Sequence, residues 1–255
     1  MDYALVSVPA AAVRRKPNHR QEMVSQLLFG EAVRVIREKG DLWVKIRGLH
    51  DNYEGWTTNT LLQEVNKEEA NQYSGYVTTG LINTLQFNNL TTNIPWGASL
   101  PSFGDGKGKV GKQFYSFSGS FIKREEQEPG EVLIKKLAMP WLNAPYQWGG
   151  RTLFGVDCSG FVQVVYKMMG LDLSRDAWQQ AQEGKIVKKL KEAVCGDLAF
   201  FDDKEEIVHV GILLNSEQII HASGKVRIDT IDKKGIIRAD TGKRTHSLRA
   251  IKRHW

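Results

Sequence analysis

The chain contains only two cysteines, Cys158 and Cys195. A small domain held together by disulfides needs more, so a disulfide framework is excluded as the basis of the fold. Unless these two residues pair with each other, both thiols are available for other chemistry. With 255 residues, the chain can bury a sizeable core without such cross-links, as one large domain or as two to three small ones.

Long apolar runs are also absent. No stretch approaches the roughly 20 residues that a membrane-spanning helix requires, so we expect no membrane segment. The N-terminal stretch has no basic region ahead of a long apolar run, so we expect no signal peptide and a cytoplasmic location. If a leader has been removed, the periplasm or the cell envelope is the alternative location.

Dense clusters of basic residues are missing, although the net charge is +6. Lysines and arginines are spread along the chain, and only small clusters occur, at 188–189, 233–234 and 252–253. A patch for nucleic acid or for an anionic surface needs tighter clustering. We therefore interpret the charge as a mixed, solvated surface and expect no nucleic-acid partner.

The first half of the chain alternates apolar and polar residues. The runs YALVSVP, EAVRVIRE, LWVKIRG and YEGWTT predict strands of a small barrel over residues 1–66. The segment EVNKEEANQ is charged and poor in apolar residues, so we interpret it as a linker. The runs YVTTGLINTLQF and KQFYSFSGSFIKR predict a second small β domain over residues 67–128.

The pattern changes after Pro129. The segments EVLIKKLAMPWLN, CSGFVQVVYKMMG and SRDAWQQAQEG have apolar residues at helical spacing, and Gly170 is placed to end the second of these helices. The runs DLAFF, VHVGILL, QIIHAS and LRAIKRH predict strands. Helices followed by strands predict an α+β domain over residues 129–255.

The run GVDCSGFVQVVY predicts that Cys158 lies at the start of a helix, with Asp157 in the N-cap position. Free backbone N–H groups and the positive end of the helix dipole favour a thiolate there, and the N–H of Cys158 can also bind an oxyanion. Ser159 and Gly160 keep the first turn small, so that a substrate backbone can approach. The alternative is a buried cysteine that acts only as a small hydrophobic residue.

A base for this thiol is offered by His209 and His221, which lie on two strand-like runs joined by a turn at 215–217. Both are at similar distances from the turn, so they can become neighbours across a hairpin. One histidine can then take the thiol proton while the other orients it through its second ring nitrogen. The alternative is that both histidines are packing residues.

A zinc site formed by Cys158, His209 and His221 is a further alternative. The spacing does not resemble a compact zinc finger, and the sequence offers no CxxC pair. We therefore expect no metal. Cys195 has no histidine near it in sequence, and we interpret it as structural.

With these residues in place, the chain resembles the NlpC/p60 cysteine peptidases, which have a papain-like fold. The resemblance covers about residues 130–255 and rests on WGGRTLFGVDCSGFVQVVY, GDLAFF, HVGILL and IIHAS. It implies a triad of Cys158 as nucleophile, His209 as base and His221 as orienting residue. It also implies that Tyr146, just ahead of QWGG, contributes its hydroxyl to the oxyanion hole.

The upstream part resembles bacterial SH3 domains, through VRRKPNHRQEMVSQLLFGEAVRV and DNYEGWTT. This arrangement is typical of γ-D-glutamyl-L-diamino acid endopeptidases, which act on cell-wall peptides with a free N-terminal L-Ala. The resemblance implies that Glu31, Tyr53 and Asp176 close the end of the site that holds this amine. It implies that Asp157 and Ser159 line the substrate cleft. A buried α-ammonium prefers carboxylate partners, which is consistent with the assignment of Glu31 and Asp176 to this end of the site.

The sequence therefore predicts an α+β protein with a papain-like NlpC/p60 catalytic domain preceded by two small SH3-like β-barrels. We expect it to hydrolyse the γ-D-glutamyl–diamino acid bond of muropeptides, releasing L-Ala-γ-D-Glu, in cell-wall recycling. We expect a monomer without a cofactor. The third residue of its peptide substrate is expected to be diaminopimelate or lysine. The alternatives are a cell-wall-binding protein with an inactive peptidase domain and a thiol acyltransferase.

Overall fold

The computed structural model describes residues 1–72, 75–88 and 90–255. Contacts divide the chain into two compact units. The N-terminal unit comprises Met1–Glu126 and Trp148–Leu153, and the C-terminal unit comprises Gln127–Gln147 and Phe154–Trp255. In the described part of the chain, no helix is both long enough and apolar enough to cross a membrane.

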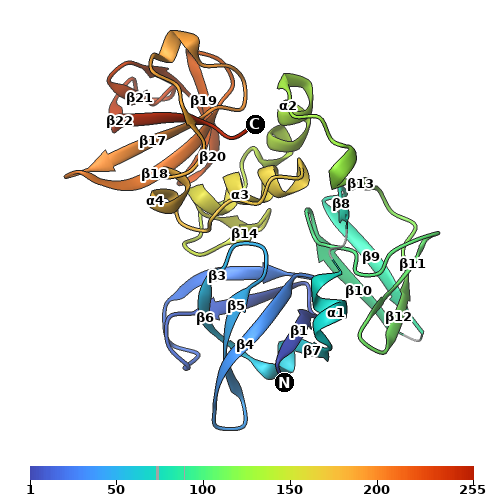
Figure 1. Cartoon of the computed structure of the whole chain (residues 1–255). Helices are drawn as coiled ribbons and strands as arrows, with labels where there is room; N and C mark the ends of the chain where they lie inside the picture. The colour runs from blue at the N-terminus through green and yellow to red at the C-terminus, as the bar shows by residue number, and fades with distance from the viewer. Residues whose placement is uncertain (73–74, 89) are drawn as a thin grey trace. The chain divides into compact units, whose positions relative to one another are not determined.

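The first part of the N-terminal unit is a seven-stranded antiparallel sheet, drawn in blue in Figure 1. Its strand order is β3-β2-β6-β5-β4-β1-β7. Alternate residues of β2 are buried, as the sequence pattern predicts, and they pack with other apolar side chains into a core that includes Val13, Leu27 and Val44. The elements are β1 (Tyr3–Val6), β2 (Ala10–Arg14), β3 (Met23–Leu28), β4 (Ala32–Lys39), β5 (Trp43–Gly48), β6 (Glu54–Thr58), η1 (Asn59–Leu61) and β7 (Leu62–Val65).

The segment interpreted as a linker instead contains a short helix, α1 (Lys67–Asn71). Asn66 and Glu69 form a reciprocal capping box at its start, which provides partners for two backbone N–H groups. Composition alone suggested a linker because these five residues carry only one buried side chain, Ala70. The linker interpretation is therefore wrong for this segment.

The remainder of the N-terminal unit holds a four-stranded sheet, β10-β9-β12-β11, and a separate pair, β13-β8. One hydrophobic core contains Leu5 and Phe29 from the first sheet region together with Leu85, Ile94 and Tyr115 from this one. Both β regions thus share a core. The elements are β8 (Tyr76–Thr78), β9 (Ile82–Phe87), β10 (Leu90–Pro95), β11 (Lys107–Val110), β12 (Gln113–Ser116), β13 (Phe121–Lys123) and η2 (Arg124–Glu126), and β14 (Arg151–Thr152) belongs to the later segment of this unit.

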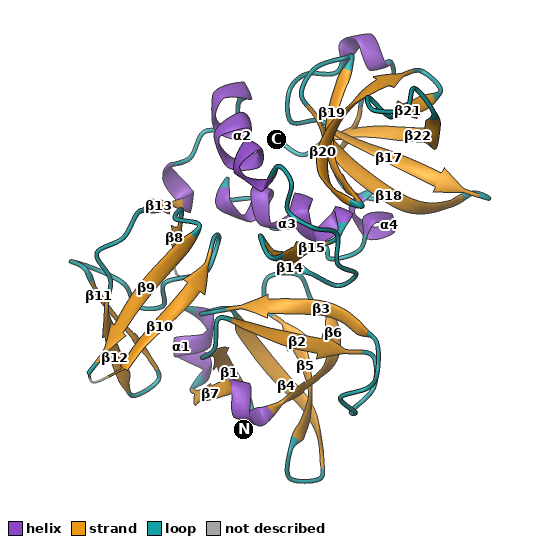
Figure 2. Ribbon diagram, turned by 180° about the vertical axis from the view of Figure 1, so that it is seen from behind, coloured by secondary structure: helices purple, strands orange, loops and turns teal. Residues whose placement is uncertain are grey.

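The C-terminal unit combines helices with a seven-stranded sheet of order β16-β22-β17-β18-β19-β20-β21, in which β22 also pairs with β21 and closes the sheet on itself. Helix α3 packs against β18 and β19, and Figure 2 shows it beside these strands. The helices are α2 (Glu131–Ala138), η3 (Met139–Trp141), α3 (Cys158–Met168), α4 (Ala177–Gln180) and η4 (Leu190–Glu192). The strands are β15 (Gly155–Val156), β16 (Lys185–Ile186), β17 (Leu198–Asp203), β18 (Glu206–Leu213), β19 (Gln218–Ser223), β20 (Lys225–Asp232), β21 (Gly235–Ile237) and β22 (Arg244–Arg253).

The predicted α+β character of this unit is confirmed, and so are its main helices and strands. Helix α2 stops before Pro140, which lies in a 3-10 turn. Helix α3 ends ahead of Gly170, whose φ of 86° is the left-handed conformation of a C′ glycine. The sequence pattern did not predict strands β20 and β21, and β20 carries a buried aspartate that contacts the site.

Candidate active site

Cys158 is the first residue of α3, and its N-cap is Asp157. The Asp157 Oδ1 atom accepts the Gly160 backbone N–H at 2.7 Å, which confirms the predicted N-cap. The Cys158 sulfur accepts the backbone N–H of Val210 on β18 and that of Ser159 in its own helix. The thiol is therefore held against β18 at the residue that follows His209.

The two histidines come together across the β18–β19 pair, as predicted from their distances to the turn. Their arrangement is diagonal, because the residue opposite His221 is Gly211, two positions beyond His209. The His209 Nε2 and His221 Nδ1 atoms lie 2.8 Å apart, and both side chains are buried. A Cβ on Gly211 would lie 2.7 Å from the Cβ of His221, so glycine makes room for this imidazole.

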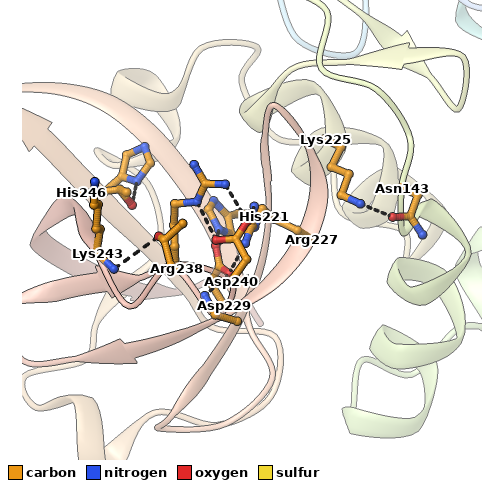
Figure 3. Close-up of polar contacts among 12 residues, drawn as sticks. Asn143, His221, Lys225, Arg227, Asp229, Arg238, Asp240, Lys243 and His246 are labelled. Atoms are coloured by element: carbon orange, nitrogen blue, oxygen red, sulfur yellow. Dashed lines mark hydrogen bonds and ion pairs between the residues drawn. The ribbon is translucent and has the colours of Figure 1, made fainter.

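A carboxylate that the sequence analysis did not identify extends this pair. Asp229 on β20 places its Oδ2 atom 3.1 Å from the His221 Nε2 atom, on the side away from His209 (Figure 3). Its side chain is fully buried. The run KVRIDTID alternates enough to suggest a strand, but nothing in its spacing marks Asp229 as facing inward. The contacts thus run from His209 through His221 to Asp229, and Cys158 is bound to the backbone N–H of Val210, the residue that follows His209.

A third imidazole covers the other side of His209. His246 on β22 stacks on it, with ring centroids 4.2 Å apart and planes inclined by 24°. The His246 Nδ1 atom lies 2.8 Å from the Thr245 hydroxyl. The sequence analysis missed His246 because the last strand was predicted from Leu248 onward, whereas β22 begins at Arg244.

Burial governs the protonation of the thiol and its base. It raises the pKa of the Cys158 thiol to about 12, with a further contribution from the negative charge of Asp157. Burial also lowers the pKa of His209 well below its usual value, and the neighbouring His221 and His246 rings add to this shift. Taken separately, the two groups rest as neutral thiol and neutral imidazole. A buried thiolate needs a positive charge close by, such as a protonated imidazole, to compensate its own charge.

The Tyr146 phenol is near enough to Cys158 for the two groups to interact electrostatically. Its backbone pairs with Val156 just before α3, and its N–H donates to the Gly224 carbonyl at 3.0 Å. Burial raises the pKa of the phenol above its usual range, and Cys158 contributes to the shift. The phenol therefore stays protonated and can donate a hydrogen bond near Cys158.

Asp157 and Ser159 are both bound to a buried arginine that the sequence analysis did not identify. Arg175 grips the Asp157 carboxylate with two hydrogen bonds, at 3.0 Å and 2.6 Å. The same guanidinium donates to the Ser159 hydroxyl at 2.9 Å. The next residue, Asp176, caps α4 in a capping box with Gln179. Arg175 thus connects three residues that the resemblance assigns to substrate binding.

Glu31 and Tyr53 belong to the N-terminal unit. Glu31 is buried, and its two oxygens accept hydrogen bonds from the Arg151 guanidinium at 2.7 Å and 3.0 Å. It also accepts the Leu28 backbone N–H at 2.9 Å. Tyr53 lies in the loop between β5 and β6, where its N–H donates to the Asp51 carboxylate at 3.0 Å. The role of Glu31 and Tyr53 in binding a free amine stays a prediction.

The zinc interpretation gains no support from the geometry. Among the described residues, no group of three His, Cys, Asp or Glu side chains is arranged to hold a metal ion. Cys158 and Cys195 are both free thiols. Burial raises the pKa of Cys195 to about 11, which keeps this thiol protonated and unreactive at neutral pH.

Two family models match the chain. Residues 143–245 match the NlpC/P60 family, and residues 13–60 match the bacterial dipeptidyl-peptidase Sh3 domain. Cys158, His209 and His221 all lie within the first match. Both resemblances drawn from the sequence, and the fold class that they implied, are confirmed.

Curated relatives match most of the chain. Dipeptidyl-peptidase 6 of Lysinibacillus sphaericus is 26% identical, over 91% of this chain and 92% of its own. The γ-D-glutamyl-L-lysine dipeptidyl-peptidase of Bacillus subtilis is 29% identical, over 78% of this chain and 71% of its own. The crystal structure of an NlpC/P60 family protein from Bacillus cereus shares the fold, with a TM-score of 0.81 at 22% identity over 99% of both chains. The chain is therefore a cysteine peptidase of the NlpC/P60 family that carries a bacterial dipeptidyl-peptidase SH3 domain ahead of its catalytic domain.

Proposed function

We propose that this peptidase hydrolyses the γ-D-glutamyl–diamino acid bond of short peptidoglycan peptides that begin with a free L-Ala, releasing L-Ala-γ-D-Glu. The observation that carries the proposal is the match to dipeptidyl-peptidase 6 along nearly the whole chain, which includes the N-terminal unit as well as the peptidase domain. A match limited to the peptidase domain would support cleavage of cell-wall peptides, but it would not indicate which bond is cleaved.

The reaction begins when His209 takes the proton of the Cys158 thiol and the sulfur attacks the γ-carbonyl carbon of D-Glu. The oxyanion that forms is bound by the Cys158 backbone N–H and the Tyr146 hydroxyl. His209 then gives its proton to the amine of the diamino acid as the C–N bond breaks, which leaves a thioester on Cys158. Water activated by His209 hydrolyses the thioester, and the proton returns to the sulfur.

Recognition of the free amine is assigned to carboxylates. Glu31, held by Arg151, and Asp176, at the start of α4, are the proposed partners of the L-Ala ammonium, and Tyr53 is proposed to contribute to the same recognition. A carboxylate whose position is fixed by an arginine or by a helix cap needs no rearrangement when a ligand binds, so the cost of ordering is small.

The test is mass spectrometry of the products from L-Ala-γ-D-Glu-diaminopimelate, from the matching L-Lys peptide, and from N-acetylated versions of both. We expect L-Ala-γ-D-Glu from the free peptides and at least tenfold slower release from the acetylated ones. Equal cleavage of free and acetylated peptides would refute the assignment of Glu31 and Tyr53. Comparison of the two free peptides identifies the preferred diamino acid.

The nucleophile is tested by Cys158→Ala, with Cys195→Ala as the matched control for losing a buried thiol. The Cys158 variant should lose at least 10³-fold in turnover while it stays folded, because the nucleophile is gone. The Cys195 variant should retain turnover. Full activity of Cys158→Ala would overturn the mechanism. Retention on insoluble peptidoglycan without cleavage of any peptide would instead favour a wall-binding role.

A further inference from the structure

We propose that Asp229 is a positioning residue that sets the tautomers of His221 and, through it, of His209, so that His209 presents a bare Nδ1 atom to the thiol. The inference rests on the proposed roles of Cys158 and His209. It adds a member to the chain of contacts that neither the sequence motifs nor the hairpin of histidines identifies.

The first step concerns His221. An ionised carboxylate only accepts hydrogen bonds, so the His221 Nε2 atom, 3.1 Å from Asp229 Oδ2, must carry a proton. Asp229 is ionised at any neutral pH, because hydrogen bonds from His221, Ala239 and Arg227 lower its pKa to about 2 despite its burial. The first tautomer in the chain is therefore dictated by the acid.

The tautomer of His221 in turn determines the tautomer of His209. In its neutral form His221 carries one ring proton, so a proton on Nε2 leaves Nδ1 bare. That atom lies 2.8 Å from the His209 Nε2 atom, which must therefore be the donor. With its own proton on Nε2, His209 has a bare Nδ1. This is the ring nitrogen not used by His221, and it is free to take the thiol proton.

The neighbours of Asp229 fix the orientation of its carboxylate. Its Oδ1 atom accepts the Ala239 backbone N–H at 2.9 Å and the Arg227 Nη2 group at 2.9 Å. Arg227 is itself bound to Asp240, which also pairs with Arg238, as Figure 3 shows. The Oδ2 atom faces His221 and also lies 2.8 Å from the Arg227 Nε atom, so both carboxylate oxygens are held in place. Asp229 is also only 2% exposed, so water does not compete for this oxygen.

Asp229 could instead serve only as a buried support for β20, and Asp229→Asn separates the two roles. The amide oxygen should remain on the Oδ1 side, because two hydrogen bonds hold it there, one of them from the backbone, whereas the Oδ2 side has a single arginine contact, from Arg227 Nε. The amide NH₂ then faces His221 and acts as a donor. His221 must accept at Nε2 and carry its proton on Nδ1, so His209 must accept at Nε2 and carry its own proton on Nδ1. The bare nitrogen opposite the thiol would be lost.

The first measurement needs neither a variant nor a substrate. Histidine-selective ¹⁵N labelling of the intact wild-type chain, read by long-range ¹H–¹⁵N correlation spectra at pH 7.5, assigns the tautomers of His209 and His221. We expect protons on both Nε2 atoms. A proton on Nδ1 of either ring would overturn the proposal, whatever the protein cleaves.

The second measurement compares Asp229→Asn with Asp232→Asn. Asp232 is on the same strand, where it pairs with Arg244 and accepts the Lys234 and Gly235 backbone N–H groups, so it controls for loss of an arginine-bound carboxylate. We expect Asp229→Asn to lower kcat about 100-fold with little change in KM and to invert both tautomers, a smaller loss than the ~10⁴-fold of direct triads because one imidazole intervenes. Asp232→Asn should keep kcat within about twofold. Unchanged kcat and tautomers in folded Asp229→Asn would refute the proposal.

If Asp229→Asn does not fold, the wild-type spectra alone decide the question. The proposed function fails separately, through an active Cys158→Ala variant. The tautomer assignment would remain valid in that case.

Discussion

Asp157 and Asp229 are both buried aspartates of the C-terminal unit, and each contacts an arginine, but their carboxylates have different further partners. Asp157 gives both oxygens to Arg175. Asp229 shares its oxygens between Arg227 and His221. An arginine is always charged and has no tautomer to select, so the Asp157 pair only fixes positions. A histidine can carry its proton on either nitrogen, so its carboxylate partner decides where the proton is.

The N-terminal unit offers a second pair of the fixed kind. Glu31 and Arg151 are bound through two hydrogen bonds and are both buried. The residues that the family resemblance assigns to substrate recognition thus include two carboxylates held by arginines. The residues assigned to proton transfer are held by imidazoles and by Asp229. Recognition needs a constant charge, whereas catalysis needs a proton that moves.

The largest expected effect comes from breaking the fixed pair in the C-terminal unit. Asp157→Asn keeps an efficient N-cap but leaves the buried Arg175 charge without its counterion. We expect the free energy of unfolding to fall by about 3–5 kcal/mol. Urea unfolding followed by circular dichroism measures it. Asp240→Asn, in an ion pair about half exposed, is the control and should cost at most about 1 kcal/mol. A loss below 1 kcal/mol for Asp157→Asn would show that the pair does not fix this region.

The next effect concerns the space for the histidine pair. Gly211→Ala would place a Cβ atom 2.7 Å from the Cβ of His221 and 2.7 Å from the Ile219 side chain. Relief of this overlap should cost about 1–3 kcal/mol in stability and lengthen the contact between His209 and His221, so kcat should fall. Gly104→Ala is the control, because a Cβ there meets nothing within 4 Å. Equal kcat in the two variants would contradict the close fit.

The pH dependence of stability tests whether the buried histidines of the site are neutral in the folded chain. The folded-state pKa of His209 is lowered by burial, and that of His246 is lowered to about 4 for the same main reason. The unfolded chain therefore binds more protons below about pH 6.5, so stability is complete above that pH and is lost as the pH falls. The free energy of unfolding should be constant from pH 7.5 to about 6.5 and should decrease from there to pH 5. A flat profile would mean that neither histidine is buried in its neutral form.

The smallest effect is expected for the stacked ring. His246→Phe keeps an aromatic face against His209 and removes an imidazole whose charged form, populated only near pH 4, lowers the His209 pKa. We expect kcat to change less than tenfold at pH 7.5, while the acid limb of the kcat/KM profile moves to higher pH. Steady-state kinetics from pH 4.5 to 8 measures both. A shift of that limb to lower pH would exclude an electrostatic role for His246.

Much of the architecture could be predicted from local pattern. The strands of the first sheet, helix α3 with its Asp157 cap and the hairpin of His209 and His221 follow from periodicity, capping and turn spacing. Helix α1 was missed because its stability comes from a capping box and not from an apolar face. Arg175 was missed because an arginine in a short polar segment gives no sign that it is buried.

The sequence by itself determined the position of Cys158 at a helix start, the histidine pair and the family, because these depend on residues close together in the chain or joined by one turn. Only the tertiary structure decided which partners hold them. Asp229 and His246 reach the histidines through pairing of β20 with β19 and through closure of the sheet by β22, which are long-range contacts. Arg175 reaches Asp157 across 18 residues of chain. Burial makes these contacts strong, and burial is a property of the folded chain that no local spacing encodes.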